Sequence, residues 1–110
     1  MIAKDLLDYL NSELAVDVYM EAPEQLTNYV LIDQTGTSRT NHIITTTFAI
    51  QSYAPSLYEA MVMNEFVKVA MEGFAELANV TRVELETDYN FTNTATKQYR
   101  WQAVYSIIHY

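Results

Sequence analysis

The stretch Phe48-Ala-Ile-Gln-Ser-Tyr-Ala-Pro-Ser-Leu-Tyr-Glu-Ala60 joins a strand to the longest helix that the sequence predicts. The alternating pattern of the strand ends just before Pro55, which cannot donate a hydrogen bond within a sheet. Ser56 and Glu59 then fit an S-x-x-E capping box: the serine oxygen accepts from the backbone N–H three residues on, and the glutamate reaches back to the N–H of the cap. The pattern predicts a helix that follows this cap and runs to about Leu77.

Apolar residues recur along this helix at the spacing of one helical face. They are Ala60, Met63, Val67, Ala70, Phe74 and Leu77. The opposite face carries Glu65, Lys68, Glu72 and Glu76. We therefore expect the strand to lay Phe48 and Ile50 against the apolar stripe, and Asn79 to cap the end of the helix in a left-handed conformation.

The remaining elements follow from the same periodicities, worked outward from this joint. An apolar repeat every fourth residue predicts a first helix at 2–14. Alternation predicts strands at 16–20, 42–53, 80–87 and 99–110, with Val83 and Leu85 facing inward, and a compact apolar run of β-formers predicts a strand at 29–33. Two polar segments, 34–41 and 88–97, are expected to be loops. The order α-β-β-β-α-β-β predicts one α+β domain over residues 1–110: a five-stranded antiparallel or mixed sheet with two helices on one face.

Composition excludes several classes of function. The net charge is −8, which argues against a nucleic-acid groove, because phosphates are bound by clustered Lys and Arg. No cysteine is present, so disulfides, thiolate metal sites and thiol catalysis are excluded. No apolar run approaches the ~20 residues needed to span a bilayer, and the acidic start lacks the apolar core of a signal peptide. We expect no membrane partner and synthesis in the cytoplasm.

Catalytic chemistry finds little support in the sequence. Neither His42 nor His109 has a second histidine at ligand spacing, so no metal site is predicted. Glu84 and Glu86 share one side of a predicted strand, and such a pair can raise one carboxyl pKa. More often a pair of this kind is a solvated strand face, with Arg82 nearby to neutralise it. We predict no catalytic, cofactor-binding or metal residues.

The two polar segments are the best candidates for contacts with other subunits or partners. In the first, Arg39 suits bidentate contact with a carboxylate on another copy of this acidic chain, although a solvated loop is equally consistent with the pattern. The candidate contact residues are Gly36, Ser38, Arg39, Asn41, Tyr89, Asn90 and Phe91. The nine tyrosines fit either strand cores or an interface. Seven acids and no base lie between Asp5 and Ser38, which fits either a polarised subunit or simple solubility.

Three short motifs resemble one known family when their order is considered. They are Gly36-Thr-Ser-Arg-Thr-Asn41, Ala49-Ile-Gln-Ser-Tyr-Ala54 running into a capped helix, and Arg100-Trp-Gln-Ala103. Together, after an N-terminal helix, they resemble the tail-completion or tail-terminator proteins encoded in the head–tail gene clusters of tailed bacteriophages and prophages. The resemblance extends over nearly the whole chain.

The resemblance implies a structural protein of the virion rather than an enzyme. It implies a homo-oligomeric ring, commonly a hexamer, at the head-proximal end of the tail tube, in contact with the tail tube protein and with a head-completion or connector protein. DNA would pass through the lumen without specific binding, and an acidic lumen would repel it. The alternative is a small oligomeric ligand-binding module of ferredoxin-like type, which needs a concave apolar pocket with converging polar groups. An enzyme using Glu84 and Glu86 ranks third.

Overall fold

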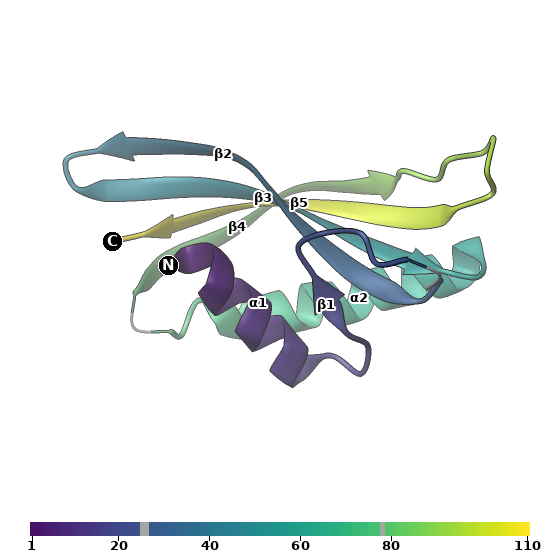
Figure 1. Ribbon diagram of the computed structural model, residues 1–110. Helices are drawn as coiled ribbons and strands as arrows, with labels where there is room; N and C mark the ends of the chain where they lie inside the picture. The colour runs from purple at the N-terminus through teal and green to yellow at the C-terminus, as the bar shows by residue number, and fades with distance from the viewer. Residues whose placement is uncertain (25–26, 78) are drawn as a thin grey trace.

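The computed structural model describes residues 1–24, 27–77 and 79–110 and contains two helices and a five-stranded sheet (Figure 1). In chain order the elements are α1 (Ile2–Glu13), β1 (Val18–Tyr19), β2 (Tyr29–Thr40), β3 (Ile43–Ala54), α2 (Leu57–Phe74), β4 (Val80–Asn90) and β5 (Tyr99–His109). The expected order α-β-β-β-α-β-β is confirmed.

The sheet is open and mixed, with the strand order β1-β2-β3-β5-β4. The short strand β1 runs parallel to β2, and all other neighbours are antiparallel. Both helices lie against one face, as Figure 1 shows, so the α+β fold expected from the sequence is confirmed. Strand β5 lies between β3 and β4, so β3, α2 and β4 form the split β-α-β unit known from ferredoxin-like folds.

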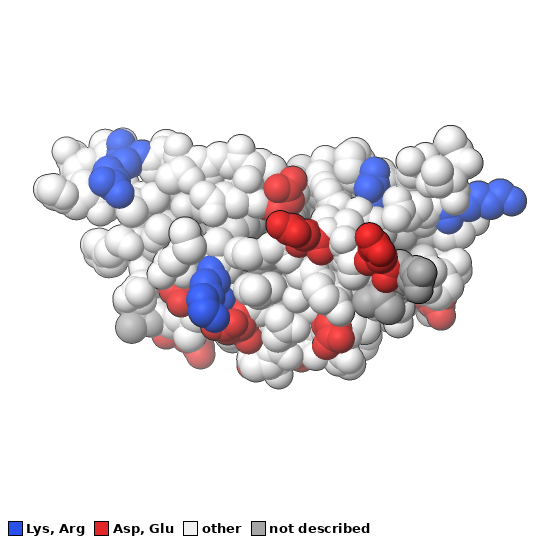
Figure 2. All heavy atoms as spheres, viewed as in Figure 1, with Lys and Arg blue, Asp and Glu red and all other residues white. Residues whose placement is uncertain are grey.

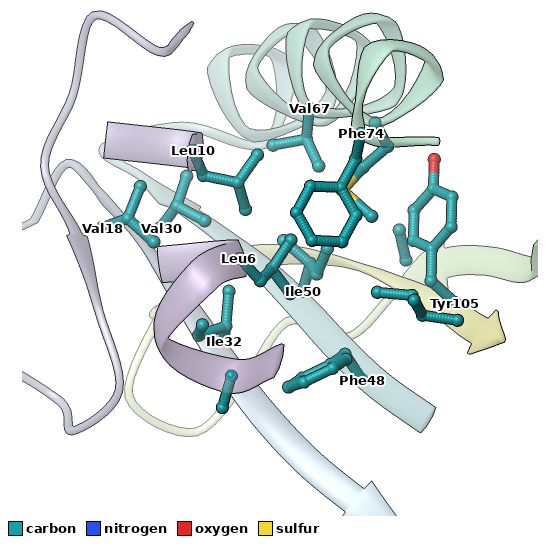
Figure 3. Close-up of a cluster of buried hydrophobic side chains, with 14 of the residues drawn as sticks. Leu6, Leu10, Val18, Val30, Ile32, Phe48, Ile50, Val67, Phe74 and Tyr105 are labelled. Carbon is teal, nitrogen blue, oxygen red and sulfur yellow. The ribbon is translucent and has the colours of Figure 1, made fainter. Parts of the chain in front are cut away.

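The core lies between the helices and the inner face of the sheet (Figure 3). Phe48 and Ile50 point from β3 toward the helices and are fully buried, as the sequence predicted. Helix α2 contributes Val67 and Phe74 to the same cluster. Helix α1 is held against α2 partly by Tyr9, which also packs its ring against Phe74.

Helix α2 begins where the capping motif predicted and ends earlier than expected. Ser56 is the N-cap, and its Oγ accepts from the Glu59 backbone N–H at 3.2 Å while its hydroxyl donates to the Glu59 carboxylate at 3.0 Å. The helix ends at Phe74 with Ala75 as C-cap, so the expectation that Asn79 caps it is wrong. The buried face also differs from the expected stripe: it consists of Ala60, Asn64, Val67, Met71 and Phe74.

The expectation of a loop at 34–41 is wrong: residues 34–40 belong to a paired strand, and only Asn41 lies in a turn. Strand β2 continues to Thr40 and pairs with β3 through partners such as Thr37 with Thr46, after one bulge between Gln34 and Gly36. Threonine favours a pleated strand even without an apolar pattern. The turn is only Asn41 and His42, with φ of 50° and 68°, the two left-handed residues of a type I′ hairpin.

Strand boundaries differ at two further places, and one strand residue is more exposed than expected. Strand β4 continues to Asn90, so the second expected loop begins only at Phe91. Leu85 lies on the helix side of the sheet, as expected, opposite the buried Tyr105, but it is 44% exposed because β4 is the edge strand. The strand expected at 16–20 shrinks to the two residues of β1.

Candidate assembly surfaces

The first group of candidate contact residues lies on a two-stranded ribbon, here called the arm, which consists of residues 34–47 of β2 and β3. The structure places Gly36, Ser38 and Arg39 on β2 and Asn41 in the turn. All four residues are exposed. Since Ser38 and Arg39 are paired with Thr45 and Ile44, the hydrogen-bonded ladder orders these contact residues.

The second group, Tyr89, Asn90 and Phe91, lies at the opposite end of the sheet (Figure 1). Tyr89 and Phe91 meet edge to face at 5.9 Å between ring centroids. The Arg100 guanidinium lies 4.4 Å from the centroid of the Phe91 ring, and its Nε donates to the Phe91 carbonyl at 2.6 Å. The Asn90 side chain accepts from the Thr92 backbone N–H. The structure therefore keeps the two groups apart, at the two ends of a molecule 44 Å long.

A chain of side-chain hydrogen bonds crosses the outer face of the sheet, away from the helices. Arg100 donates to the Tyr53 hydroxyl at 2.9 Å, and Tyr53 donates to Gln51 at 2.8 Å. Gln51 donates to Gln102 at 2.7 Å, and Gln102 donates to the hydroxyl of Tyr89. Tyr53, Gln51 and Gln102 are buried although both helices lie on the other face of the sheet. Each is paired, so the network fixes the alignment of β3, β5 and β4.

The tyrosines divide between core and surface, so neither expectation holds for all nine. Tyr29 and Tyr53 are buried and stack at 4.4 Å between centroids, with Tyr19 against Tyr29 edge to face. In contrast, Tyr58 is 74% exposed. Sequence reasoning could not assign individual tyrosines, because burial here depends on neighbouring strands rather than on local pattern.

An exposed apolar face on α2 was not predicted. Five large apolar side chains of this helix are more than a third exposed: Tyr58, Met61, Val62, Phe66 and Val69. Tyr58, Val62, Phe66 and Val69 follow one another at intervals of four, four and three residues, which is a second helical stripe. That spacing is visible in the sequence, which therefore contains two apolar stripes on this helix.

This face is hollowed into a groove, here called the α2 groove. One hollow of about 350 Å³ lies between the C-terminal end of α1 and the middle of α2. A second, of about 220 Å³, continues along the first turns of α2. Met63 and Phe66 line both hollows, so the two hollows form one continuous surface. The charged side chains that line it are Glu13 and Glu59, both acidic.

Charge is distributed unevenly over the molecule (Figure 2). In that view the end of the molecule formed by the arm shows a basic side chain and no acidic one, whereas the acidic side chains gather in the middle and in the lower half. The arm contains Arg39 and no Asp or Glu. Basic side chains also lie near the opposite end and, at one place, beside acidic ones, so this view shows an uneven distribution of charge and not two faces of opposite sign.

A charged cluster on the helix side ties α2 to β4 and β5. Asp88 accepts from Lys68 at 3.1 Å and from the Trp101 indole at 3.0 Å, and Lys68 also pairs with Glu65 at 3.0 Å. The indole bond, and then the lysine, lower the pKa of Asp88 below its usual value. The hydrogen bonds to Glu65 and Asp88 raise the pKa of Lys68. An aspartate held ionised in this way suits a structural tie and not a general acid.

The glutamates and histidines considered as catalytic candidates lie on β4, in the turn of the arm and at the end of β5. Arg82 pairs with Glu84, and Glu86 lies at a bulge of β4. His42 lies in the exposed turn. His109, the last residue of β5, is buried, and its Nε2 lies 2.8 Å from the hydroxyl of Thr46 on the neighbouring strand β3.

Searches for other kinds of site return nothing within the part of the chain that the structure describes. Residues 1–24, 27–77 and 79–110 hold no group of three His, Cys, Asp or Glu side chains placed to bind a metal ion. Neither described helix is long and apolar enough to cross a membrane. A scan against protein-family models and a search of the curated proteins each find no match.

Proposed function

We propose that this chain is a non-enzymatic structural subunit that assembles with copies of itself into a ring of the phage tail-terminator or tail-completion type. Such a ring, commonly a hexamer, would end the tail tube of the virion and join it to the head connector. The observation that carries the proposal is the uncovered apolar face of α2. Large apolar patches on a soluble subunit usually mark a contact surface.

The size and composition of this face support contact with protein. Tyr58, Phe66 and Val69 are each at least 60% exposed, and aromatic residues are enriched at the buried centres of interfaces. A chain of charge −8 gains solubility from its acids, so leaving these side chains uncovered serves no evident purpose in a monomer.

The motifs behind the family resemblance also converge in space. Residues 49–54 of β3 pair directly with residues 99–104 of β5, which include Arg100-Trp-Gln-Ala103. The hydrogen bonds between Gln51 and Gln102 and between Arg100 and Tyr53 join the two motifs. The third motif forms the arm at the end of the same sheet. Motifs that are separate in sequence thus build one continuous part of the subunit, which supports reading them together.

The proposed partners follow from this role. The ring would contact the tail tube protein on one side and a head-completion or connector protein on the other. Of the acids between Asp5 and Asp33, those outside the α2 groove would line the lumen, where like charge would keep passing DNA from binding. Finding these acids on the outer surface of an assembled ring would refute the lumen assignment.

The test is assembly in the presence of tail tubes. Purified chain, alone and mixed with tubes, is analysed by size-exclusion chromatography with light scattering and by electron microscopy. We expect closed rings in concentrated solution or at tube ends, and tubes that stop growing once capped. Phe66→Ser, on the exposed face, should abolish rings and keep the fold. A chain that stays monomeric and leaves tubes uncapped would refute the proposal.

The ligand-binding alternative draws support from the split β-α-β unit, which belongs to ferredoxin-like folds. The larger hollow of the α2 groove is apolar, but Glu13 is the one charged side chain lining it. A small-molecule site needs several polar groups that converge on the ligand. A broad apolar face with an acidic edge therefore favours a macromolecular partner.

A further inference from the structure

We infer that the arm of one subunit docks into the α2 groove of the next, so that copies join head to tail through two different surfaces. This inference rests on the proposed function, since the occupant of the groove is a second copy of the chain. It goes further by naming the two surfaces that meet and the charged pair that orients them.

The groove has the composition of a binding surface that lacks its partner. Apart from Asn28 and two glutamates, its lining is apolar, with Met63 and Phe66 shared by both hollows and Val69 beside them. Its charged lining is wholly acidic, from Glu13 at one end and Glu59 at the other. The complementary occupant is therefore narrow and partly apolar, with positive charge and no carboxylates.

The arm has these properties. It is a two-stranded ribbon closed by a two-residue turn, so its tip is slender. Ile43 beside the turn is 44% exposed and supplies an apolar contact. Arg39 is exposed, and no Asp or Glu lies anywhere in residues 34–47. The chain contains fourteen acids, so a segment with a cation and no acid is electrostatically complementary to an acidic groove.

A symmetric contact between two α2 grooves fits the charges less well. It would bring Glu13 and Glu59 of one copy toward the same residues of the other, and like charges brought together are destabilising. The arm and the α2 groove are formed by separate parts of the subunit, the β2–β3 hairpin and the helices, as Figure 1 shows. A contact between two different surfaces is heterologous, and it produces a closed ring when the rotation between copies closes.

The test uses two variants that each lose one surface. The arm variant carries Arg39→Ser and Ile43→Ser, and the groove variant carries Phe66→Ser and Val69→Ser. All four side chains are exposed, so we expect both variants to fold, which circular dichroism checks. Sedimentation is measured for each variant alone and for an equimolar mixture, up to about 1 mM, where weak contacts are still populated.

The head-to-tail contact predicts a specific outcome. Each variant alone stays monomeric, whereas the mixture forms a one-to-one dimer and nothing larger, because one intact arm meets one intact groove. A symmetric groove contact predicts the opposite: the arm variant assembles alone and the mixture gains nothing. A monomeric mixture, a monomeric wild-type chain at the same concentration, or an arm variant that assembles like wild type would each overturn the inference.

A charge exchange tests the polar part of the contact independently. Arg39→Glu should weaken association roughly tenfold or more, and adding Glu13→Lys in the same chain should restore most of the loss. Glu13 is the last residue of α1, where a lysine also suits the helix dipole, so the substitution should not harm the fold. Weakening by both single changes without recovery in the double variant would contradict the pairing.

The two proposals can fail separately. Wild-type rings that cap tail tubes, together with a mixture that stays monomeric, would refute the docking mode and leave the proposed function intact. One-to-one dimers from the mixture, together with wild-type chains that form open filaments and never cap a tube, would support the docking mode and refute the proposed function.

Discussion

Phe74 and Phe66 are two phenylalanines of one helix with opposite surroundings. Phe74 is fully buried against Tyr9, at 5.2 Å between ring centroids, whereas Phe66 is 60% exposed in the α2 groove. The same substitution at the two positions therefore separates folding from assembly. Residue identity alone says nothing of this difference, which arises from the face of α2 on which each lies.

Phe74→Ala should lower the free energy of unfolding by about 3–5 kcal/mol, because it removes a buried ring and leaves a cavity. Phe66→Ala is the matched control and should change the free energy of unfolding by less than about 0.5 kcal/mol. Urea denaturation followed by circular dichroism measures both. Similar losses at the two positions would mean that the two faces of α2 have been exchanged.

Gly73 offers a second test. Whether Gly73→Ala lowers or raises the free energy of unfolding should depend on the residue at position 9. The Tyr9 hydroxyl donates to the Ala70 carbonyl at 2.6 Å, and a Cβ added at Gly73 would overlap this hydroxyl. Gly73→Ala alone should lower the free energy of unfolding by about 1 kcal/mol, through displacement of the hydroxyl and loss of its hydrogen bond.

In a Tyr9→Phe background the same change should be stabilising. The nearest atom to the new Cβ is then the ring carbon Cζ at 3.7 Å, an ordinary contact. Alanine is about 1 kcal/mol better than glycine inside a helix, so Gly73→Ala should raise the free energy of unfolding by up to that amount. A double-mutant cycle by urea denaturation measures the reversal, and the same sign in both backgrounds would contradict this explanation.

At the scale of elements, the sequence predicts helices and strands correctly where the apolar periodicity is strong and incorrectly where that periodicity is absent. Both helices, the Ser56 cap and the inward side of β3 follow from regular apolar spacing and local hydrogen bonding. The β2 strand of the arm does not follow from apolar spacing, because its residues are polar. It is stabilised by pairing with β3, for example of Thr37 with Thr46. Tyr89 and Asn90, also expected in a loop, are the last residues of β4, whereas Asn41 and Phe91 do lie outside the strands.

The second stripe of α2 shows a different limit. Apolar residues on two faces of one helix cannot be divided into buried and exposed sets without knowing which elements cover them. The cluster around Asp88 was also beyond sequence reasoning, since it joins residues from three elements that only the sheet order brings together.

The turn of the arm predicts a stabilising substitution. His42 has φ of 68°, a left-handed conformation that costs a residue with a side chain about 1–2 kcal/mol and costs glycine little. His42→Gly should therefore raise the free energy of unfolding by about 0.5–1 kcal/mol after the greater chain entropy of glycine is included. Thr40→Gly, at a paired strand position two residues earlier, is the control and should be destabilising in thermal unfolding.

The tie between α2 and β4 predicts a dependence on acid. Because the pKa of Asp88 is lowered in the folded state, its stabilising effect is present above the ordinary value of 3.8 and is lost as the pH falls through the lowered value. Unfolding measurements below pH 3.8 should show a steeper loss of stability for wild type than for Asp88→Asn. Trp101, the single tryptophan, donates to this carboxylate and should report the titration by fluorescence.

Asp33→Asn serves as the control, because this exposed carboxylate lies elsewhere on the sheet. In Asp33→Asn, both the loss of stability with falling pH and the change in Trp101 fluorescence should be the same as in wild type. A wild-type fluorescence transition that persists in Asp88→Asn would show that another group controls the tryptophan.

For the whole molecule, stability is concentrated in the two central strands. Strands β3 and β5 are paired on both sides, whereas among the described residues the outer edge of β2 pairs only at its two contacts with β1, and residues 33–40 of β2 are exposed. Hydrogen exchange in the isolated subunit should be slowest for amides of residues 48–53 and 103–107 and much faster for the outward amides of residues 34–40. Uniform protection across β2 would contradict this gradient.

The strand order also determines the sequence of events in folding. Strands β2 and β3 meet across a two-residue turn, and β4 and β5 are joined by a short connection, so both hairpins can form early. The pairing of β3 with β5 joins residues such as Gln51 and Gln102, 51 positions apart, and requires closure of a long loop that contains α2. During synthesis, β3 therefore keeps one edge unpaired until β5 has emerged from the ribosome, and in that interval the nascent chain is most prone to aggregate.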